Sequence, residues 1–330
     1  MSIIGLDFGS HSSSLALFNS DNDTIEVFSD DMGSRCIPCV VAFRGDEVLV
    51  GQGAQSQQYK NSANTFSDLR GILEAMARGG CENKHIPALD KTIPPADIIS
   101  LYFRHIHNQI KQQAGKAVRD VVVTVPIHAD ESYKENLKAA AKSGGMRIRA
   151  FIPDSWCPLV ALKFDSIETN SKLVMTIDLG WSKCEVSCHE IRAGVLFPIA
   201  SQCSLEICGK LIVEAIVEHC AKDFQRKCKV TCTDNKRAMT RLRMECENVV
   251  KILSTTSEAA IGIDSLHEGI DYCGRLTRAR FEDIISALFG KFRSLMENVL
   301  SECAAVLPSM CVSDVIIAGK SRPPTSASCH

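Results

Sequence analysis

The first thirty residues alternate between short apolar runs and polar turns. Residues 2–6, 15–18 and 25–28 are rich in apolar side chains, and Gly-, Ser-, Asn- and Asp-containing segments separate them. Runs of this length divided by turn residues are typical of strands joined by tight connections. The opening of the chain is therefore predicted to be a β-meander, with further strands over residues 39–43 and 47–50.

Helical spacing of apolar residues follows. Residues 63–76 are predicted to be a helix and 78–91 a loop, and Pro94–Pro95 opens a longer helix that ends before Gly115. The continuous apolar run at 120–125, stopped by Pro126, is typical of a strand covered on both faces. A helix over 130–143 and a strand over 146–152 complete a pattern that indicates an α/β sheet flanked by helices.

The opening pattern returns 171 residues later. Asp7, Phe8 and Gly9 follow the first strand, and Asp178, Leu179 and Gly180 follow a strand at 173–177. Two more strands, over 184–188 and 195–200, repeat the β-β-β context, which favours an internal duplication. Beyond them the pattern predicts helices over 211–226, 235–254 and 278–306, a strand over 314–318, and a disordered Pro/Ser-rich tail over 321–330.

Composition narrows the class of protein. A chain of 330 residues exceeds the size at which one hydrophobic core stops growing, so two lobes are expected. A formal charge of -2 gives no electrostatic reason to expect direct binding to nucleic acid or to a membrane. Sixteen cysteines without a secretion signal at the N-terminus indicate free thiols in the cytosol. The single CxxC spacing, Cys36 to Cys39, lacks the second ligand pair that a zinc site needs.

The two Asp-x-Gly turns are candidates for phosphate binding. Backbone N–H groups of such a turn can face phosphate oxygens, and the carboxylate can hold Mg²⁺, which usually keeps several of its waters. One turn in each lobe would place a triphosphate between Asp7 and Asp178. The alternative is that each Asp is only a turn residue.

Several motifs resemble the nucleotide-binding domain of the heat-shock protein 70 family. They lie in residues 5–11, 31–38, 121–126, 235–254, 263–271 and 277–282, and the resemblance covers residues 2–322. It implies an actin-like ATPase fold of α/β class, with ribonuclease H-like duplicated β-β-β-α-β-α cores in two lobes around a nucleotide cleft. Lobe I would span 1–164 with a shortened upper subdomain at about 37–94. Lobe II would span 165–320 with an upper subdomain at about 208–285.

The resemblance also implies a set of site residues. Asp7, Arg70, Asp154 and Asp178 match the catalytic positions, and Asp7 and Asp178 would hold Mg²⁺ through water. The phosphate contacts would come from Gly9, Ser10, His11, Gly180, Ser182, Lys183, Gly209 and Gly319. The adenosine would lie on one helix face that presents Glu247, Lys251 and Ser254 at i, i+4 and i+7. Without the resemblance, an exposed ion pair between Glu247 and Lys251 is the favoured interpretation.

Departures from the family pattern bear on catalysis. Trp181 stands where the family has Gly, which removes the freedom to adopt a positive φ. Arg70 replaces the catalytic lysine, Asp154 is one methylene shorter than the family's Glu, and Gly319 lacks the second glycine. These changes predict ATP binding with weak or absent hydrolysis. Family members also continue beyond this chain, so it is expected to be a fragment, a splice form or a protein that does not clamp peptides.

The function expected from the resemblance is that of the ATP-binding domain of an atypical chaperone. It would bind ATP or ADP with Mg²⁺ and serve a J-domain co-chaperone and a nucleotide-exchange factor. A ribosome or nascent chain would be an indirect partner in co-translational folding in the cytosol. A nucleotide-independent scaffold for co-chaperones is the alternative. A small-molecule kinase or a filament-forming actin relative is disfavoured, because the adenosine-side motifs are chaperone-like.

Overall fold

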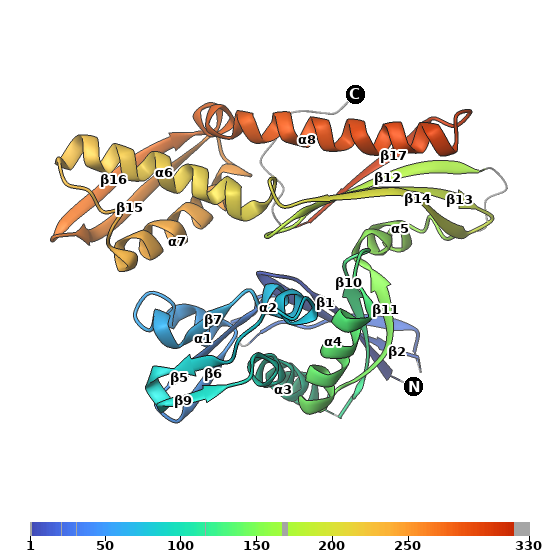
Figure 1. Ribbon diagram of the computed structural model, residues 1–330, viewed down its shortest axis with the longest axis horizontal. Helices are drawn as coiled ribbons and strands as arrows, with labels where there is room; N and C mark the ends of the chain where they lie inside the picture. Colours follow the sequence, from blue (N-terminus) through green and yellow to red (C-terminus); the bar gives the residue numbers. More distant parts are fainter. Residues whose placement is uncertain (1, 21, 31, 116, 167–170, 320–330) are drawn as a thin grey trace. The chain divides into compact units, whose positions relative to one another are not determined.

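A computed structural model describes residues 2–20, 22–30, 32–115, 117–166 and 171–319. Its contacts divide the chain into two compact units, Met1–Cys157 and Pro158–His330, drawn from blue to green and from green to red in Figure 1. The lobe boundary expected from the sequence lies slightly later, after residue 164. The tail predicted over 321–330 lies outside the described residues.

Unit 1 is built on a six-stranded mixed sheet. The order is β11-β10-β1-β2-β3, and β4 also pairs with β2. The pairs β1–β2 and β2–β3 are antiparallel, whereas β1–β10 and β10–β11 are parallel. The predicted meander is therefore confirmed. The strands are β1 (Ser2–Phe8), β2 (Ser12–Asn19), β3 (Thr24–Val27), β4 (Ile37–Pro38), β10 (Asp120–Val125) and β11 (Arg147–Pro153).

Three helices complete the core of unit 1: α2 (Leu69–Ala77), α3 (Pro95–Gln113) and α4 (Glu131–Ser143). They pack against one another, and α4 also packs against β11 (Figure 1). The ring of Phe8 lies 6.0 Å from that of Tyr102 and 5.3 Å from that of Phe103, so the last residue of β1 is fixed against α3. Asp130 caps α4 by accepting a hydrogen bond from the backbone N–H of Tyr133.

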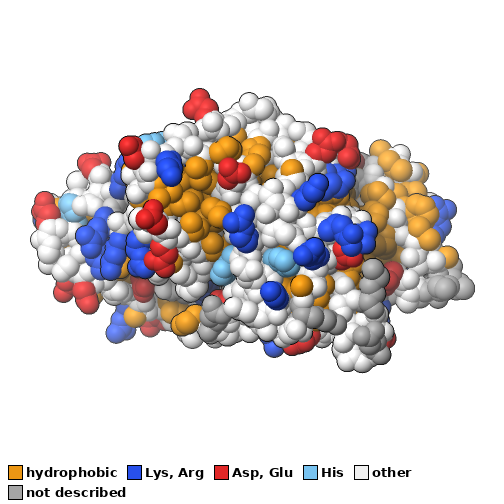
Figure 2. Space-filling model, turned by 90° about the horizontal axis from the view of Figure 1, so that it is seen from below, with side chains coloured by type: hydrophobic (Ala, Val, Ile, Leu, Met, Phe, Trp, Pro, Cys, Tyr) orange, Lys and Arg blue, Asp and Glu red, His pale blue; other side chains and the backbone are white. Residues whose placement is uncertain are grey.

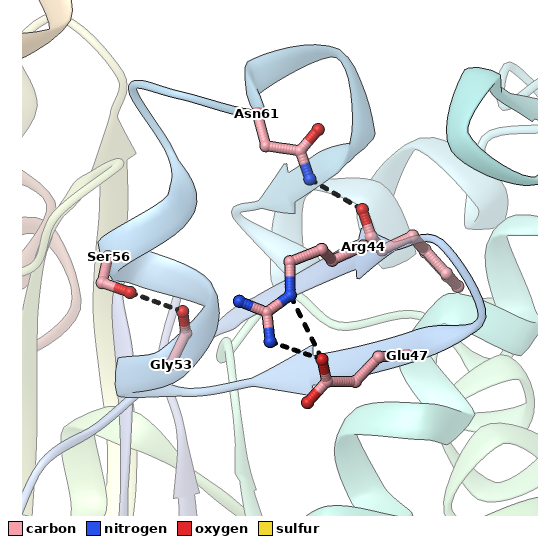
Figure 3. A network of polar contacts seen from close by, with 6 residues as sticks. Arg44, Glu47, Gly53, Ser56 and Asn61 are labelled. Atoms are coloured by element: carbon pink, nitrogen blue, oxygen red, sulfur yellow. Dashed lines mark hydrogen bonds and ion pairs between the residues drawn. The ribbon is translucent and has the colours of Figure 1, made fainter.

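The outer part of unit 1 contains small sheets. A three-stranded sheet has the order β6-β5-β7 and a two-stranded one pairs β8 with β9. In Figure 3, Arg44 donates to Glu47 across the β5–β6 turn, and the side chains of Asn61 and Ser56 donate to backbone carbonyls. The elements are β5 (Val40–Arg44), β6 (Glu47–Val50), α1 (Gln52–Gln57), η1 (Ser62–Asn64), β7 (Thr65–Ser67), β8 (Lys84–Ile86), η2 (Pro87–Leu89) and β9 (Lys91–Ile93).

Two predictions fail in this part. The helix predicted from residue 63 begins only at Leu69, because residues 65–67 form strand β7 and pair with β5. Asp68 then caps α2 by accepting from the N–H of Gly71 at 3.0 Å. The region 78–91, predicted to be a loop, contains β8, η2 and the first residue of β9. Strands this short carry too few residues for a period-2 pattern to show.

Unit 2 has a four-stranded sheet of order β14-β13-β12-β17. Helix α8 packs against β13 and β14, and α6 and α7 pack against each other and against the hairpin β15–β16. The three helices predicted in this unit, now α6, α7 and α8, are confirmed. The β15–β16 hairpin between α7 and α8 was not predicted. The elements are α5 (Cys157–Ala161), β12 (Lys172–Leu179), β13 (Cys184–Arg192), β14 (Val195–Ser204), α6 (Gly209–Cys228), α7 (Lys236–Leu253), β15 (Glu258–His267), β16 (Ile270–Thr277), α8 (Arg278–Val306) and β17 (Val312–Ala318).

The two sheets share one topology. In unit 1, β1 pairs with β2 antiparallel and with β10 parallel, and helix α3 precedes β10. In unit 2, β12 pairs with β13 antiparallel and with β17 parallel, and helix α8 precedes β17. The internal duplication predicted from the repeated Asp-x-Gly turn is therefore confirmed in the strand pairing.

Charged side chains of both signs lie on the surface of the molecule. On the face shown in Figure 2, acidic and basic side chains are interspersed, as the near-neutral formal charge of -2 leads one to expect. Across the described ranges, no helix combines the length and the apolar character that crossing a bilayer requires. The same ranges hold no cluster of three or more His, Cys, Asp or Glu side chains suited to a metal ion.

Candidate functional site

The two Asp-x-Gly turns have the same construction. Asp7 pairs with Ser14 across the β1–β2 hairpin, and Asp178 pairs with Glu185 across the β12–β13 hairpin. Each Asp is the last but one residue of its strand, and residues 9–12 and 180–183 form the two connections. The duplication therefore places both carboxylates at the same position of their hairpins.

A glycine opens each connection for a steric reason. A Cβ at Gly9 would lie 2.6 Å from the carbonyl oxygen of Ser12, and one at Gly180 would lie 3.1 Å from that of Lys183. The N–H of Gly180 donates to that same carbonyl of Lys183 at 3.0 Å. Both connections are thus tight turns: an added Cβ would clash with the backbone at Gly9 and would make an unusually close backbone contact at Gly180.

Trp181 does not disturb the second turn in the way that the sequence indicated. No residue of 180–183 has a positive φ, and neither does any residue of 9–12. The expectation that Trp181 removes a needed positive φ is therefore wrong. The indole is half-buried and packs against the hydrophobic core of unit 2. A large residue fits here because its side chain has a place in the core.

The second turn lies at the N-terminus of α6. The N–H of Gly209 donates to the carbonyl of Gly180, and the N–H of Lys210 donates to that of Trp181, both at 2.9 Å. The N-terminal end of a helix carries a partial positive charge that favours nearby anions. The backbone of Gly209 and Lys210 thus contacts the second turn directly.

Gly319 also belongs to the second turn. Ala318 pairs with Asp178 in the parallel β12–β17 ladder, and Gly319 follows with a φ of +96°. A Cβ at this position would overlap the backbone of Leu179. Glycine is required here by both its φ and the close approach of the two strands.

The first turn is held by a buried ion pair that the sequence did not reveal. Arg70 on α2 and Asp154 after β11 pair at 2.5 Å between Nη2 and Oδ2, with side chains only 6% and 9% exposed. The Nη1 group of Arg70 donates to the carbonyl of Phe8 at 3.2 Å. Burial disfavours the guanidinium charge, but Asp154, Tyr133 and Glu74 together outweigh burial and raise the pKa of Arg70, with Asp154 the largest of the three. Arg70 is thereby committed to the backbone next to Asp7.

Two further residues complete this corner of unit 1. The hydroxyl of Thr124 on β10 donates to Oδ1 of Asp7 at 3.2 Å. Burial raises the pKa of the Tyr133 phenol to about 12, although the nearby Arg70 lowers it. Neither residue was predicted from the sequence. Thr124 comes close to Asp7 only through the parallel pairing of β1 with β10, which no local feature of the sequence indicates.

Several buried polar atoms around the ion pair have no hydrogen-bond partner among the described residues. They are Nε of Arg70, Oδ1 of Asp154, the Tyr133 hydroxyl, Oγ of Ser155 and Nε1 of Trp156. Buried polar groups are nearly always satisfied by protein or by ordered water. This corner of unit 1 is therefore suited to holding water next to the Asp7 turn.

The residues predicted to bind adenosine, Glu247, Lys251 and Ser254, lie on α7 and at its C-cap. Their i, i+4 and i+7 spacing places them on one face of the helix. Glu247 is half-buried, whereas Lys251 and Ser254 are exposed at the end of the helix. Burial raises the pKa of Glu247 to about 7, and the nearby Lys251 and Arg243 partly oppose this. The hydroxyl of Ser254, the C-cap residue, donates to the carbonyl of Lys251 at 2.5 Å. The helix face thus offers a carboxyl, an ammonium and a hydroxyl oxygen.

The chemistry of these groups fits a magnesium nucleotide. Mg²⁺ prefers oxygen ligands and is usually bound by one or two carboxylates with several waters, and the Asp of either turn can supply a carboxylate. The turns and the N-terminus of α6 favour phosphate oxygens, and the α7 face can hydrogen-bond hydroxyl groups of a ribose.

Comparison with known proteins agrees with this geometry. The family model described as Hsp70 protein matches residues 3–328. The chain belongs to the Hsp70 family. Its two units accordingly have the mixed α/β, actin-like ATPase fold of the Hsp70 nucleotide-binding domain. The fold class and the family predicted from the motifs are thereby confirmed.

Curated relatives are similar along almost the whole chain. Heat shock cognate 70 kDa protein 3 of Dictyostelium discoideum is 28% identical over 97% of this chain and 54% of its own length. Heat shock 70 kDa protein 14 of Danio rerio is 30% identical over 91% of this chain and 64% of its own length. Putative heat shock 70 kDa protein 7 of Homo sapiens is 28% identical over 96% of this chain and 90% of its own length. The chain spans about half the length of most of the curated Hsp70 relatives that it matches.

Proposed function

We propose that this chain is the nucleotide-binding part of an Hsp70-type chaperone that binds Mg·ATP and Mg·ADP and hydrolyses ATP slowly. The observation that carries the proposal is the pair of equivalent turns, each with an Asp at the same hairpin position and a glycine at which an added Cβ would closely approach a backbone carbonyl of the turn. Two such turns in one chain are difficult to explain as isolated loop features. Membership of the Hsp70 family supports one role for both, which is phosphate and Mg²⁺ binding.

Residues of both units would hold the nucleotide. Asp7 and Asp178 would bind Mg²⁺ through its waters, and the α7 face of Glu247, Lys251 and Ser254 would bind the adenosine. The bound Mg²⁺ would supply charge neutralisation at the phosphates. Phosphate contacts would come from Gly9, Ser10, His11, Gly180, Ser182, Lys183, Gly209 and Gly319.

Slow hydrolysis is supported by the state of Arg70. Its guanidinium is bound to Asp154 and to the carbonyl of Phe8, and it is nearly inaccessible to solvent. A group held in this way orients the Asp7 turn but has little freedom to follow a transferring phosphoryl group. Because phosphoryl transfer depends on positioning and charge stabilisation, the loss of a mobile cation at this place lowers the rate.

The proposal includes partners and a compartment that rest on the family and on composition. A J-domain co-chaperone and a nucleotide-exchange factor are the partners expected of an Hsp70 nucleotide-binding domain, and a ribosome or nascent chain would be reached through them. The cysteines of the described residues are free thiols, many of them buried, which agrees with a reducing cytosol.

Thermal unfolding with and without Mg·ATP tests nucleotide binding. A ligand at a hundred times its dissociation constant stabilises the native state by about 2.7 kcal/mol, which is a shift of a few degrees for a chain of this size. We expect Asp7→Ala and Asp178→Ala to lose the shift and Asp46→Ala, an exposed turn residue, to keep it. No shift from a wild-type chain that unfolds cooperatively would support the nucleotide-independent scaffold instead.

Single-turnover kinetics test the second part of the proposal, which is that the chain hydrolyses ATP slowly. The double change Arg70→Lys with Asp154→Glu restores the residue types that the family pattern has at these positions. We expect it to raise the rate of ATP cleavage at saturating nucleotide while leaving the dissociation constant nearly unchanged. A rate that stays the same, with the fold intact, would show that Arg70 does not limit hydrolysis.

A further inference from the structure

A cavity of about 630 Å³ lies in unit 2, on a part of the molecule that the proposed nucleotide site does not use. It lies between α6 and the β15–β16 hairpin, and its lining comes from residues 219–227 of α6, Ile261 of β15 and residues 272–276 of β16. This volume is within the range of pockets that hold a small molecule, and so it has room for one or a few side chains. None of the residues assigned to nucleotide or Mg²⁺ belongs to the lining.

The floor of the cavity is apolar and well ordered by packing. Cys220, Ile261, Tyr272 and Leu276 line it, and each is at most 3% exposed. Gly274 keeps the floor open, because a Cβ at that residue would lie 2.9 Å from the hydroxyl oxygen of Tyr272. A side chain that enters the cavity therefore meets an apolar surface with one phenol group.

The rim of the cavity is cationic. Lys222, Arg226, Lys227 and Arg275 belong to the lining, and Asp223 is its one acidic member. Asp223 is neutralised within the lining, since it pairs with Arg226 at 2.6 Å and with Lys227 at 2.7 Å. Its Oδ2 also accepts from the Tyr272 hydroxyl at 3.2 Å.

The remaining cations are weakly compensated by groups outside the lining. Lys222 pairs with Glu218 on the same helix, and both side chains are largely exposed. The nearest carboxylate oxygen to Arg275 is that of Glu258, at 3.9 Å. Exposed pairs of this kind contribute little binding energy and exchange readily for another carboxylate.

This positive charge is local. The whole chain has 37 Lys and Arg against 39 Asp and Glu, so the excess at the rim is not part of a generally basic protein. The pKa of His219, which also lines the cavity, is sensitive to this charge. Burial lowers the pKa of His219, and the cations Arg280, Arg226 and Lys222 lower it further, against Asp223.

We propose that this cavity docks an acidic segment of a partner protein, with one apolar side chain seated on the floor and carboxylates at the rim. A small phosphate-bearing ligand fits less well, because the side chains of Lys222, Arg226 and Arg275 are 72%, 77% and 78% exposed. A nucleic acid requires a longer basic surface than one cavity rim on a chain of net charge -2 provides. Charge complementarity with an apolar centre therefore selects an acidic peptide.

Fluorescence anisotropy with a labelled peptide tests the proposal. The probe is a fluorescein-labelled dodecapeptide in which Glu and Asp flank a central Leu-Phe pair, and it is added to the full chain at low salt. We expect saturable binding that weakens as salt is raised. The double variant Arg226→Glu with Arg275→Glu should bind at least tenfold more weakly. Lys291→Glu with Arg293→Glu on α8, outside the lining, is the matched change of charge and should bind normally.

A second pair of variants tests the floor without changing charge. Gly274→Ala places a methyl group against the Tyr272 hydroxyl and should weaken binding several-fold, whereas Gly262→Ala on the paired strand meets no atom within 4 Å and should not. Equal binding by the double charge variant and by its α8 control would overturn the proposal. So would equal binding of a peptide with Gly-Ser in place of Leu-Phe, or stronger competition by tripolyphosphate or an RNA oligonucleotide. The Asp7→Ala variant should bind the peptide normally, which separates this result from the nucleotide test.

Discussion

Arg70 and Asp154 are 84 positions apart in the chain and form a 2.5 Å ion pair inside unit 1. The pair joins α2 to the segment that follows β11, and through the carbonyl of Phe8 it also reaches the end of β1. Three elements that surround the Asp7 turn are thus connected through one guanidinium. A buried pair of this kind adds little net stability over an apolar pair, but it makes each partner depend on the other.

Removal of one partner should therefore be costly. Arg70→Ala leaves the Asp154 carboxylate buried without its counter-charge, and we expect the free energy of unfolding to fall by about 3–5 kcal/mol. Arg44→Ala, which breaks the exposed pair with Glu47, should cost less than about 1 kcal/mol. Urea denaturation of both variants measures the difference. If the two variants lose the same stability, the pair does not hold this corner of unit 1.

The two turn glycines should differ in their tolerance of a side chain. At Gly9 an added Cβ would lie 2.6 Å from a backbone oxygen, and at Gly180 the corresponding distance is 3.1 Å. We expect Gly9→Ala to cost about 1–3 kcal/mol, the usual cost of an inserted methyl group that backbone atoms cannot avoid, and Gly180→Ala to cost less. Thermal denaturation of both variants, with Gly262→Ala as the open-space control, checks the order. The reverse order would show that the second turn is the more rigid one.

The sequence was sufficient for the features that repeat or extend over many residues. The Asp-x-Gly repeat predicted the duplicated sheets, and the spacing of apolar residues predicted helices such as α8 to the residue. The face of α7 that carries Glu247, Lys251 and Ser254 also followed from spacing alone, because the helical period fixes which side chains share a face.

The missed features depend on contacts between distant segments. Strand β7 has three residues and exists because Phe66 pairs with Val41 on β5 and its ring lies 6.1 Å from that of Phe43. The place of Trp181 depends on a core that only the folded unit 2 provides. Likewise, nothing in the local sequence of Arg70 indicates that its charge is taken up by Asp154. Local pattern has no access to such pairings.

Glu247 should make the stability of the chain depend on pH. Burial raises its pKa from 4.5 to about 7, so the folded state binds its proton more tightly than the unfolded state does. The resulting stabilisation is complete below pH 4.5 and is lost as the pH rises to about 7. We expect Glu247→Gln to gain about 1–2 kcal/mol over wild type between these limits, after allowance for solvent screening. Urea denaturation at pH 4.5 and 7.5 measures this gain, with Glu245→Gln on the same helix as the control. A constant difference across the range would contradict the prediction.

His189 should act in the opposite direction over nearly the same range. It is fully buried on β13, neither ring nitrogen has a partner among the described residues, and burial lowers its pKa from 6.5 to about 4. The neutral ring is compatible with the folded state, so its contribution is complete above pH 6.5 and is lost as the pH falls towards 4.

Between pH 6.5 and 4, protonation of His189 should lower the free energy of unfolding of the wild-type chain by about 3 kcal/mol. Replacement by an apolar residue of similar size, His189→Leu, should remove this loss, whereas substitution of the exposed His85 by Leu should leave the pH profile as in wild type. Because Glu247 and His189 oppose each other, the wild-type profile alone is uninformative and the variants must be compared. The free energy of unfolding should be measured between pH 4 and 7.5 for three proteins. They are wild type, the single variant His189→Leu, and the double variant His189→Leu with Glu247→Gln. The comparison separates the two contributions. If the single variant still loses stability on acidification as wild type does, then His189 is not the group that titrates.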